Sequence, residues 1–512
     1  MNARALVPKT RYVLVCAMLM GACVQTQKAH QSSSASSLDD RHENQAKRQA
    51  RGSRAHQNTL QKKAFLYQLS FSDDAQEARV RLCFEGFMPE RLRSAKPQYA
   101  AFATKAQLVN QHQSIRMLQI RDDTIEIGQA NPDDCVDITI DLQRATMGSD
   151  WRFGARLENE IYLDALCLLW QPVSVPPASI ARLEFTTPPG KTFSHPWAPA
   201  SRGQWRIPWH ALDWPSIVVF GDALIETIEV PGGELQVKHL PNSSVTQREH
   251  TTLWLRDAAA ATTMLNGSYP RPRTQVTMIP AGGGGRGALF GLVKRGGGFG
   301  IHLLVSQPIK DNMIDDDWIA VHEMSHLYLP FTIKPEIWFS EGIATYYQNV
   351  LRARAGQITP EQAWSNLRNG FELGRTEFIN RSLVDATEAM PREGIYLRVY
   401  WGGAAVALAA DVELRRRSQQ ASSLDQALTE LGQCCTARQR YYAVDDLLRI
   451  LDEKVGGQTF QRIKDEMVEV PFYPDFEETW DWLGITFENG KAQFLPDAPG
   501  AAVRDDIMRG PQ

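Results

Sequence analysis

The sequence has few cysteines and almost no excess of charge of either sign. Its 512 residues include 7 Cys, which is too few for a disulfide scaffold, and none of them forms a CxxC metal-binding pattern. Lys and Arg total 55 against 59 Asp and Glu, so the net charge is -4 and no nucleic-acid partner is expected. Gly (36) and Pro (28) occur at about average frequency, which excludes a collagen-like or wholly disordered chain. The 43% of hydrophobic residues provides enough apolar mass for two or three domains.

Signatures of nucleotide binding and internal repeats are also missing. Glycine clusters stand at residues 282–285 and 296–298, but no GK[ST] follows them and no strand–GxGxxG–helix unit is present. We therefore expect these glycines to supply tight turns and close backbone approach rather than a phosphate site.

Residues 1–22 predict an export signal. Three basic residues precede an apolar stretch at 12–22, which is shorter than the roughly 20 residues that span a membrane. Small residues stand directly before Cys23, as in a bacterial lipobox, so Cys23 is expected to become the lipid-modified first residue. Cleavage after Ala22 by the ordinary signal peptidase is the alternative, and in both cases the protein leaves the cytoplasm.

Residues 23–62 are polar, without apolar periodicity, and are expected to form a disordered tether. Val24 follows Cys23 where an Asp would retain a lipoprotein in the inner membrane. The resemblance to Gram-negative lipoproteins therefore implies an outer-membrane anchor, with the protein facing the periplasm. Disulfides form in such a compartment, and Cys83 and Cys135, on neighbouring strand-like runs, are the favoured pair. The connectivity stays open at this stage.

The rest of the chain divides into two halves with different periodicity. Residues 63–245 contain short, alternating, β-branched runs separated by turn-rich clusters, which predicts an antiparallel β-sandwich. Residues 246–490 are mostly helical, with strands near 274–280, 288–295 and 299–306, and 491–512 are expected to form a tail. The fold class is thus α+β, with two domains.

The most informative motif is His-Glu-Met-Ser-His at residues 322–326. On a helix, His322 and His326 share one face and can bind one metal ion. Glu323 lies about 100° around the axis from His322, where it can reach a metal-bound water without being a ligand. The alternative is a surface helix whose histidines only pair with neighbouring side chains.

The segment WFSEGIATYY at residues 338–347 supplies a third ligand, Glu341. Pro330 and Pro335 mark a reversal, so a helix beginning near Ser340 can run back and bring Glu341 to the histidine pair. Two His and one Glu leave a fourth position open, which is typical of a catalytic zinc site. We therefore predict one Zn²⁺ ion, with other divalent metals left open.

With HExxH followed by WFSEGIATYY, the chain resembles the gluzincin zinc metallopeptidases, most closely the glycyl aminopeptidases and more distantly aminopeptidase N-type enzymes. This resemblance implies a thermolysin-like peptidase domain in which the strand at 299–306 is the sheet edge that holds the substrate. Residues 400–415 are similar to the family's Tyr-Lys-Gly-Ala helix, which implies that Tyr400 donates a hydrogen bond to the oxyanion, with Tyr396 as the rival. No Gly-x-Met-Glu-Asn signature for a free amino terminus is present, so exo- versus endopeptidase action stays open.

The sequence thus predicts a zinc peptidase of the bacterial envelope that acts on a peptide or protein substrate. Glu323 is the predicted general base and Tyr400 the predicted oxyanion donor. Two alternatives remain. One is a catalytically silent, peptidase-fold lipoprotein that serves as a binding or scaffolding module, and the other is zinc-dependent hydrolysis of a bond other than a peptide bond.

Overall fold

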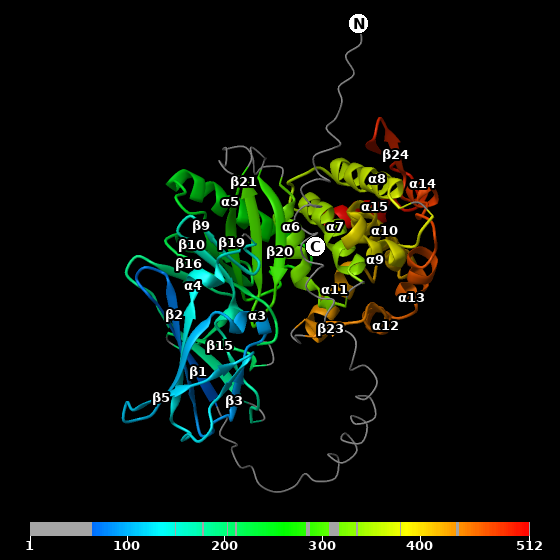
Figure 1. Ribbon diagram of the computed structural model, residues 1–512. Helices are drawn as coiled ribbons and strands as arrows, with labels where there is room; N and C mark the ends of the chain where they lie inside the picture. Colours follow the sequence, from blue (N-terminus) through cyan, green and yellow to red (C-terminus); the bar gives the residue numbers. More distant parts are fainter. Residues whose placement is uncertain are drawn as a thin grey trace, which may run out of the picture.

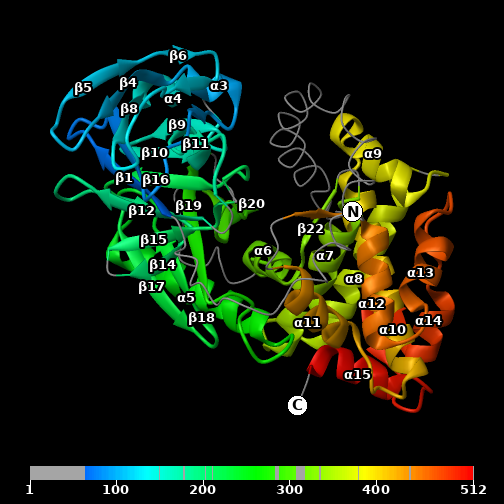
Figure 2. The ribbon, with the colours of Figure 1, turned by 90° about the horizontal axis from the view of Figure 1, so that it is seen from below.

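The computed structural model describes residues 64–510 except 149, 177–178, 202, 210–211, 283–286, 307–316, 334–335, 379 and 437–439. The predicted signal segment, Cys23 and the predicted tether lie outside these residues. Figure 1 shows a β-rich region joined to a helical region, and Figure 2 shows α6 (Ile319–Ser325) between them. The fold class is α+β, as predicted.

The N-terminal region is a β-sandwich whose two main sheets share one core. Phe71 and Phe220 stack across this core with their ring centroids 4.0 Å apart. The larger sheet has eight strands, in the order β14 (Ala198–Ser201), β15 (Gln204–Ile207), β12 (Ile180–Thr186), β1 (Ala64–Phe71), β2 (Glu77–Phe84), β8 (Cys135–Asp141), β4 (Ala103–Val109) and β5 (Ile115–Leu118). The facing sheet has four strands, β13 (Thr192–Ser194), β16 (Ile217–Gly221), β10 (Glu160–Asp164) and β9 (Gly154–Leu157). A second four-stranded sheet contains β11 (Gln171–Pro172), β3 (Arg91–Arg93), β7 (Thr124–Glu126) and β6 (Ile120–Arg121).

The sandwich is largely antiparallel, but one pair of strands departs from the prediction. Strands β1 and β12 pair in parallel, because the long connection between them lets β12 arrive in the same direction. Cys83 of β2 and Cys135 of β8 stand opposite each other in the register and are joined by a disulfide, as the sequence favoured. A second disulfide joins the adjacent residues Cys434 and Cys435, which the sequence analysis did not pair.

The second region contains a five-stranded sheet. Its strand order shows that two predictions were wrong. The strand order is β17 (Ile225–Val230), β18 (Gly233–Lys238), β19 (Arg273–Ala281), β21 (Gly300–Ser306) and β20 (Ala288–Lys294). The predicted boundary at residue 245 is therefore too late, since β17 and β18 already belong to this sheet. The predicted edge strand is also wrong. The strand at 299–306 is β21, which lies inside the sheet, and β20 lies at the edge.

Helix α5 (Val245–Thr263) connects β18 to β19, which pair in parallel. It begins directly after Ser244, whose side chain forms a reciprocal capping box with that of Gln247. Helix α7 (Trp338–Arg354) packs against α6, and the later helices pack against α7 or one another. They are α8 (Pro360–Thr376), α9 (Leu383–Glu393), α10 (Tyr396–Arg417), α11 (Leu424–Cys435), α12 (Val444–Val455), α13 (Thr459–Ile463), α14 (Glu477–Leu483) and α15 (Ala501–Arg509). Two strand pairs complete this region, β22 (Phe331–Thr332) with β23 (Tyr441–Tyr442) and β24 (Ile485–Glu488) with β25 (Lys491–Phe494).

The segment predicted as a tail is packed structure. Strand β25 pairs with β24, and α15 buries Val503, Ile507 and Met508 in the helical core. Arg354 of α7 donates a hydrogen bond to the carbonyl of Ile507 at 2.8 Å. The apolar residues of α15 recur at helical spacing, but the segment is too short for that signal to stand out in the sequence. None of the helices in the described part of the chain is long and apolar enough to cross a membrane.

Candidate active site

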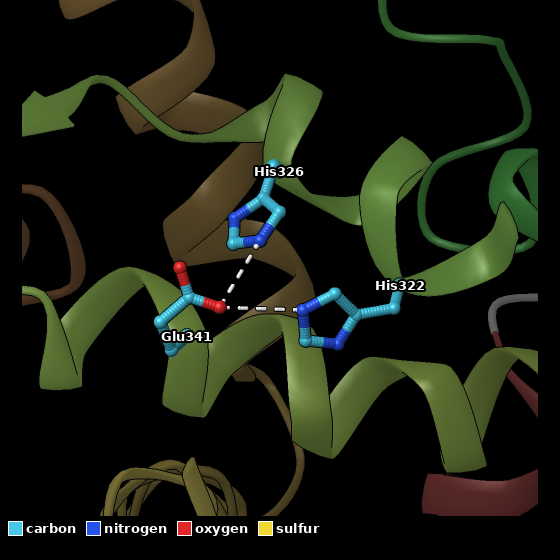
Figure 3. A group of neighbouring side chains, drawn as sticks. All are labelled: His322, His326 and Glu341. Atoms are coloured by element: carbon cyan, nitrogen blue, oxygen red, sulfur yellow. Dashed lines mark hydrogen bonds and ion pairs between the residues drawn. The ribbon is translucent and has the colours of Figure 1, made fainter. Parts of the chain in front are cut away.

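The predicted metal ligands come together between α6 and α7. His322 lies in α6, His326 begins the 3-10 turn η5 (His326–Tyr328) that continues it, and Glu341 lies in the first turn of α7. One carboxylate oxygen of Glu341 lies 3.3 Å from Nε2 of His322 and 3.4 Å from Nε2 of His326, as Figure 3 shows. Over the described residues, these three side chains form the one group of His, Cys, Asp and Glu with metal-binding geometry.

The spacing of these atoms fits a zinc ion. Zinc bonds of about 2.0–2.2 Å at tetrahedral angles place the ligand atoms about 3.4 Å from one another. The two separations from Glu341 have this length, and all three ligand atoms lie within 4.8 Å of one another. Neutral imidazole nitrogens and a carboxylate oxygen are also the donors that zinc accepts. The residues present therefore fit the ion.

A hydrogen bond at Nδ1 sets the orientation of the His322 ring. Nδ1 lies 2.8 Å from Oε1 of Gln348, which stands two turns beyond Glu341 on α7. With its proton on Nδ1, the imidazole donates to Gln348 and directs the lone pair of Nε2 toward the ligand cluster. The sequence analysis missed Gln348. Its position seven residues after Glu341, on the same face of α7, is the signal that could have found it.

Electrostatics at the site favour a cation. Burial raises the pKa of Glu341, but the two imidazoles outweigh this effect and hold the pKa well below the usual range. Burial lowers the pKa of His322, but Glu341 and Glu323 outweigh it and the pKa is raised. For Glu323, burial raises the pKa, and the opposing effect of the histidines is smaller. Two carboxylic side chains thus lie beside the imidazoles, Glu323 buried and Glu341 partly exposed.

Glu323 lies at the edge strand and is not one of the three clustered ligands. The side chain is 7% exposed and lies against the backbone of Gly291 in β20. A Cβ atom at position 291 would lie 2.3 Å from Cγ of Glu323, so only glycine leaves room for the predicted base. The carboxylate of Glu323 is therefore held between the histidine helix and the outermost strand of the sheet.

Tyr400 lies beside the predicted metal ligands, on α10. Its ring is nearly parallel to the imidazole of His322, with the centroids 6.0 Å apart and the planes 9° from each other. Tyr396, the predicted rival, lies one turn earlier and is buried. Two glycines allow α10 to approach α7 this closely, since a Cβ on Gly403 would lie 2.2 Å from the carbonyl oxygen of Trp338 and one on Gly342 would meet the backbone of Gly403.

The comparisons with known proteins agree with this geometry. Residues 320–389, which contain the histidine pair and Glu341, match the family model described as M61 glycyl aminopeptidase. This match confirms the predicted resemblance. No curated protein matches the chain.

Solved structures also match this chain, at low sequence identity. An aminopeptidase N family protein from Idiomarina loihiensis is 17% identical with a TM-score of 0.60, and the match covers 82% of this chain and 78% of that one. An M1 zinc metallopeptidase from Deinococcus radiodurans is 14% identical with a TM-score of 0.48, covering 80% and 94%. Yeast LTA4 hydrolase is 12% identical with a TM-score of 0.45, covering 84% and 72%. The first of these supports the two-part architecture found here.

Proposed function

We propose that the protein is a zinc-dependent peptidase. The observation that carries the proposal is the convergence of His322, His326 and Glu341 at zinc-ligand spacing, with Glu323 beside them on the edge of the sheet. A bound zinc ion would lower the pKa of its water toward about 7 and polarise the carbonyl of the scissile bond.

The chain's own residues supply the remaining steps. Glu323 accepts a proton from the attacking water and returns it to the leaving amine, first as general base and then as general acid. Tyr400, beside His322, donates a hydrogen bond to the oxyanion that forms on the scissile carbonyl.

Strand β20 is the proposed binding site for the peptide backbone. Strand β20 pairs on one side with β21, and it is the last strand of its sheet in the described part of the chain. An extended peptide can add to such an edge through backbone hydrogen bonds. A peptide in this position passes Gly291 and therefore passes the carboxylate of Glu323.

Metal analysis and turnover test the proposal together. We expect the purified protein to contain one zinc per chain, to cleave casein or members of a peptide library, to lose this activity to a chelator and to regain it with zinc. Zinc binding without cleavage of any peptide would contradict the peptidase proposal and support the silent binding module. Comparing each cleaved peptide with its N-acetylated form would separate aminopeptidase from endopeptidase action, since a blocked amino terminus stops only the former.

We further propose that the protein is exported and anchored in the outer membrane through a lipid on Cys23, facing the periplasm. The support is the predicted signal segment and the small residues before Cys23. Cell fractionation of a Cys23→Ala variant tests it, and we expect this variant to leave the membrane fraction. Membrane attachment that survives the substitution would contradict the lipid anchor.

A further inference from the structure

The edge strand β20 and the helix α6 run beside each other in the same direction, and polar side chains join them at both ends. Asp317 precedes α6, and Arg295 follows β20 directly. Each side chain reaches from one element to the backbone of the other. Between these two connections, Gly291 lies against Glu323.

The first connection joins the beginnings of the two elements. One carboxylate oxygen of Asp317 accepts a hydrogen bond from the N–H of Ala288, the first residue of β20, at 2.8 Å. The other oxygen accepts from the N–H of Ile319, the first residue of α6, also at 2.8 Å. A carboxylate in this position also interacts favourably with the helix N-terminus. One side chain thus fixes the start of the strand against the start of the helix.

The second connection joins the far ends. The guanidinium of Arg295 donates to the carbonyl of His326 at 2.6 Å and to the carbonyl of Leu329. These carbonyls belong to the turn that closes α6, where a cation offsets the negative end of the helix. Arg295 is 5% exposed and lies 4.1 Å from the ring centroid of Phe331, so its position is fixed by packing as well.

We infer that Asp317 and Arg295 are positioning residues that fasten the peptide-binding strand to the metal-binding helix. The pair fixes Glu323 over β20, and Arg295 also fixes the backbone of the ligand His326. The role of β20 as peptide site rests on the proposed function, but the fastening itself is a property of the backbone. It therefore has a test that needs no turnover.

The test combines hydrogen exchange with zinc affinity, measured by competition with a chelator. In Arg295→Met and Asp317→Asn, we expect amides of residues 288–294 to exchange on the order of tenfold faster. Arg295→Met is also expected to weaken zinc binding about tenfold, the usual effect of losing a group that orients a ligand. Arg295→Lys keeps the charge and one donor, so it should restore part of both properties. If Arg295→Met does not fold, the comparison of Arg295→Lys with the unchanged protein provides the test.

Two matched controls come from elsewhere in the chain. Arg273 is a buried arginine that donates to the carbonyls of His195 and Trp197. Asp452 is a buried carboxylate that accepts from the backbone N–H groups of Phe460 and Gln461. Arg273→Met and Asp452→Asn should lower the melting temperature without changing zinc affinity or exchange at 288–294.

Exchange at 288–294 that rises equally in the controls, or that stays unchanged in the Arg295 and Asp317 variants, would overturn the inference. Absence of peptidase activity in the unchanged protein would contradict the proposed function alone, because neither measurement depends on catalysis.

Discussion

Helix α7 contributes to two clusters of polar side chains, and both clusters contain carboxylates. At its first turn, Glu341 faces His322 and His326. Further along, three of its side chains enter a network of hydrogen bonds and ion pairs with two neighbouring helices. We call this the closed network, and its members are Tyr346, Tyr347 and Arg354 of α7, Asp411 and Arg415 of α10 and Asp425 of α11.

In the closed network, donors and acceptors complement one another. Arg415 lies 2.9 Å from both Asp411 and Asp425, Arg354 also pairs with Asp425 at 2.9 Å, and the two tyrosine hydroxyls donate to these carboxylates. At the first turn, by contrast, the ring nitrogens of His322 and His326 and one carboxylate oxygen of Glu341 converge at a spacing that suits a bound cation. The closed network is thus satisfied by its own residues, whereas the side chains at the first turn of α7 fit an added cation.

Removing one of the proposed zinc ligands should have the largest effect. Each of the substitutions His326→Ala and Glu341→Ala should leave two protein ligands, abolish stoichiometric zinc and with it all peptidase activity. Elemental analysis of the purified variants measures the first effect and peptide turnover the second. Unchanged zinc content in either variant would remove that residue from the site.

A substitution in the closed network should instead lower stability and leave zinc binding intact. Removing one partner of a buried ion pair leaves the other charge uncompensated, which typically costs about 3–5 kcal/mol of stability. We therefore expect Arg415→Met to lower the free energy of unfolding by about this amount in urea titrations, while the folded fraction still binds one zinc. A loss of zinc at temperatures where this variant remains folded would show that the two clusters are coupled.

Tyr400 lies beside the ligand cluster, whereas Tyr396 lies one turn earlier. Substituting each tyrosine in turn therefore distinguishes a catalytic role from a packing role. Tyr400→Phe removes one hydrogen bond made chiefly in the transition state. The value of kcat should fall about a hundredfold, or about 2.7 kcal/mol, with little change in KM, zinc content or Tm. Tyr396→Phe, assayed on the same peptide, should keep its turnover. A crippled Tyr396→Phe with a normal Tyr400→Phe would assign the oxyanion to the other residue.

His302, on β21, provides a contrast with His322, because its imidazole is buried without Glu341 or Glu323 beside it. Burial, aided by Lys294, lowers its pKa from 6.5 to about 3, whereas the pKa of His322 is raised. Between about pH 3 and 6.5 the unfolded chain binds this proton and the folded chain does not, so acidification from pH 7 to 5 should cost about 2 kcal/mol of stability. His302→Gln should remove this part of the pH dependence, as urea titrations at both pH values would show. An unchanged dependence would place the effect in another group.

Features that depend on spacing along the chain could be predicted from the sequence. Features that depend on pairing between distant segments could not. The i, i+4 relation of His322 and His326 and the reversal before Glu341 follow from helix geometry, and the structure brings these residues together. Which strand occupies the sheet edge depends on pairing between distant segments, so β21 was mistaken for the edge in place of β20. Asp317 and Arg295 act on the backbone of another element, for which the sequence carries no periodic signal.

Glu323 is the proposed general base at a site where three other residues would hold the metal. Peptide turnover by Glu323→Gln, with its zinc content measured in the same preparation, tests it most directly. We expect one zinc per chain, as in the unchanged protein, and a rate about 10²–10⁴-fold lower, the usual contribution of a general base. Turnover within a few-fold of the unchanged protein at full zinc occupancy would contradict it.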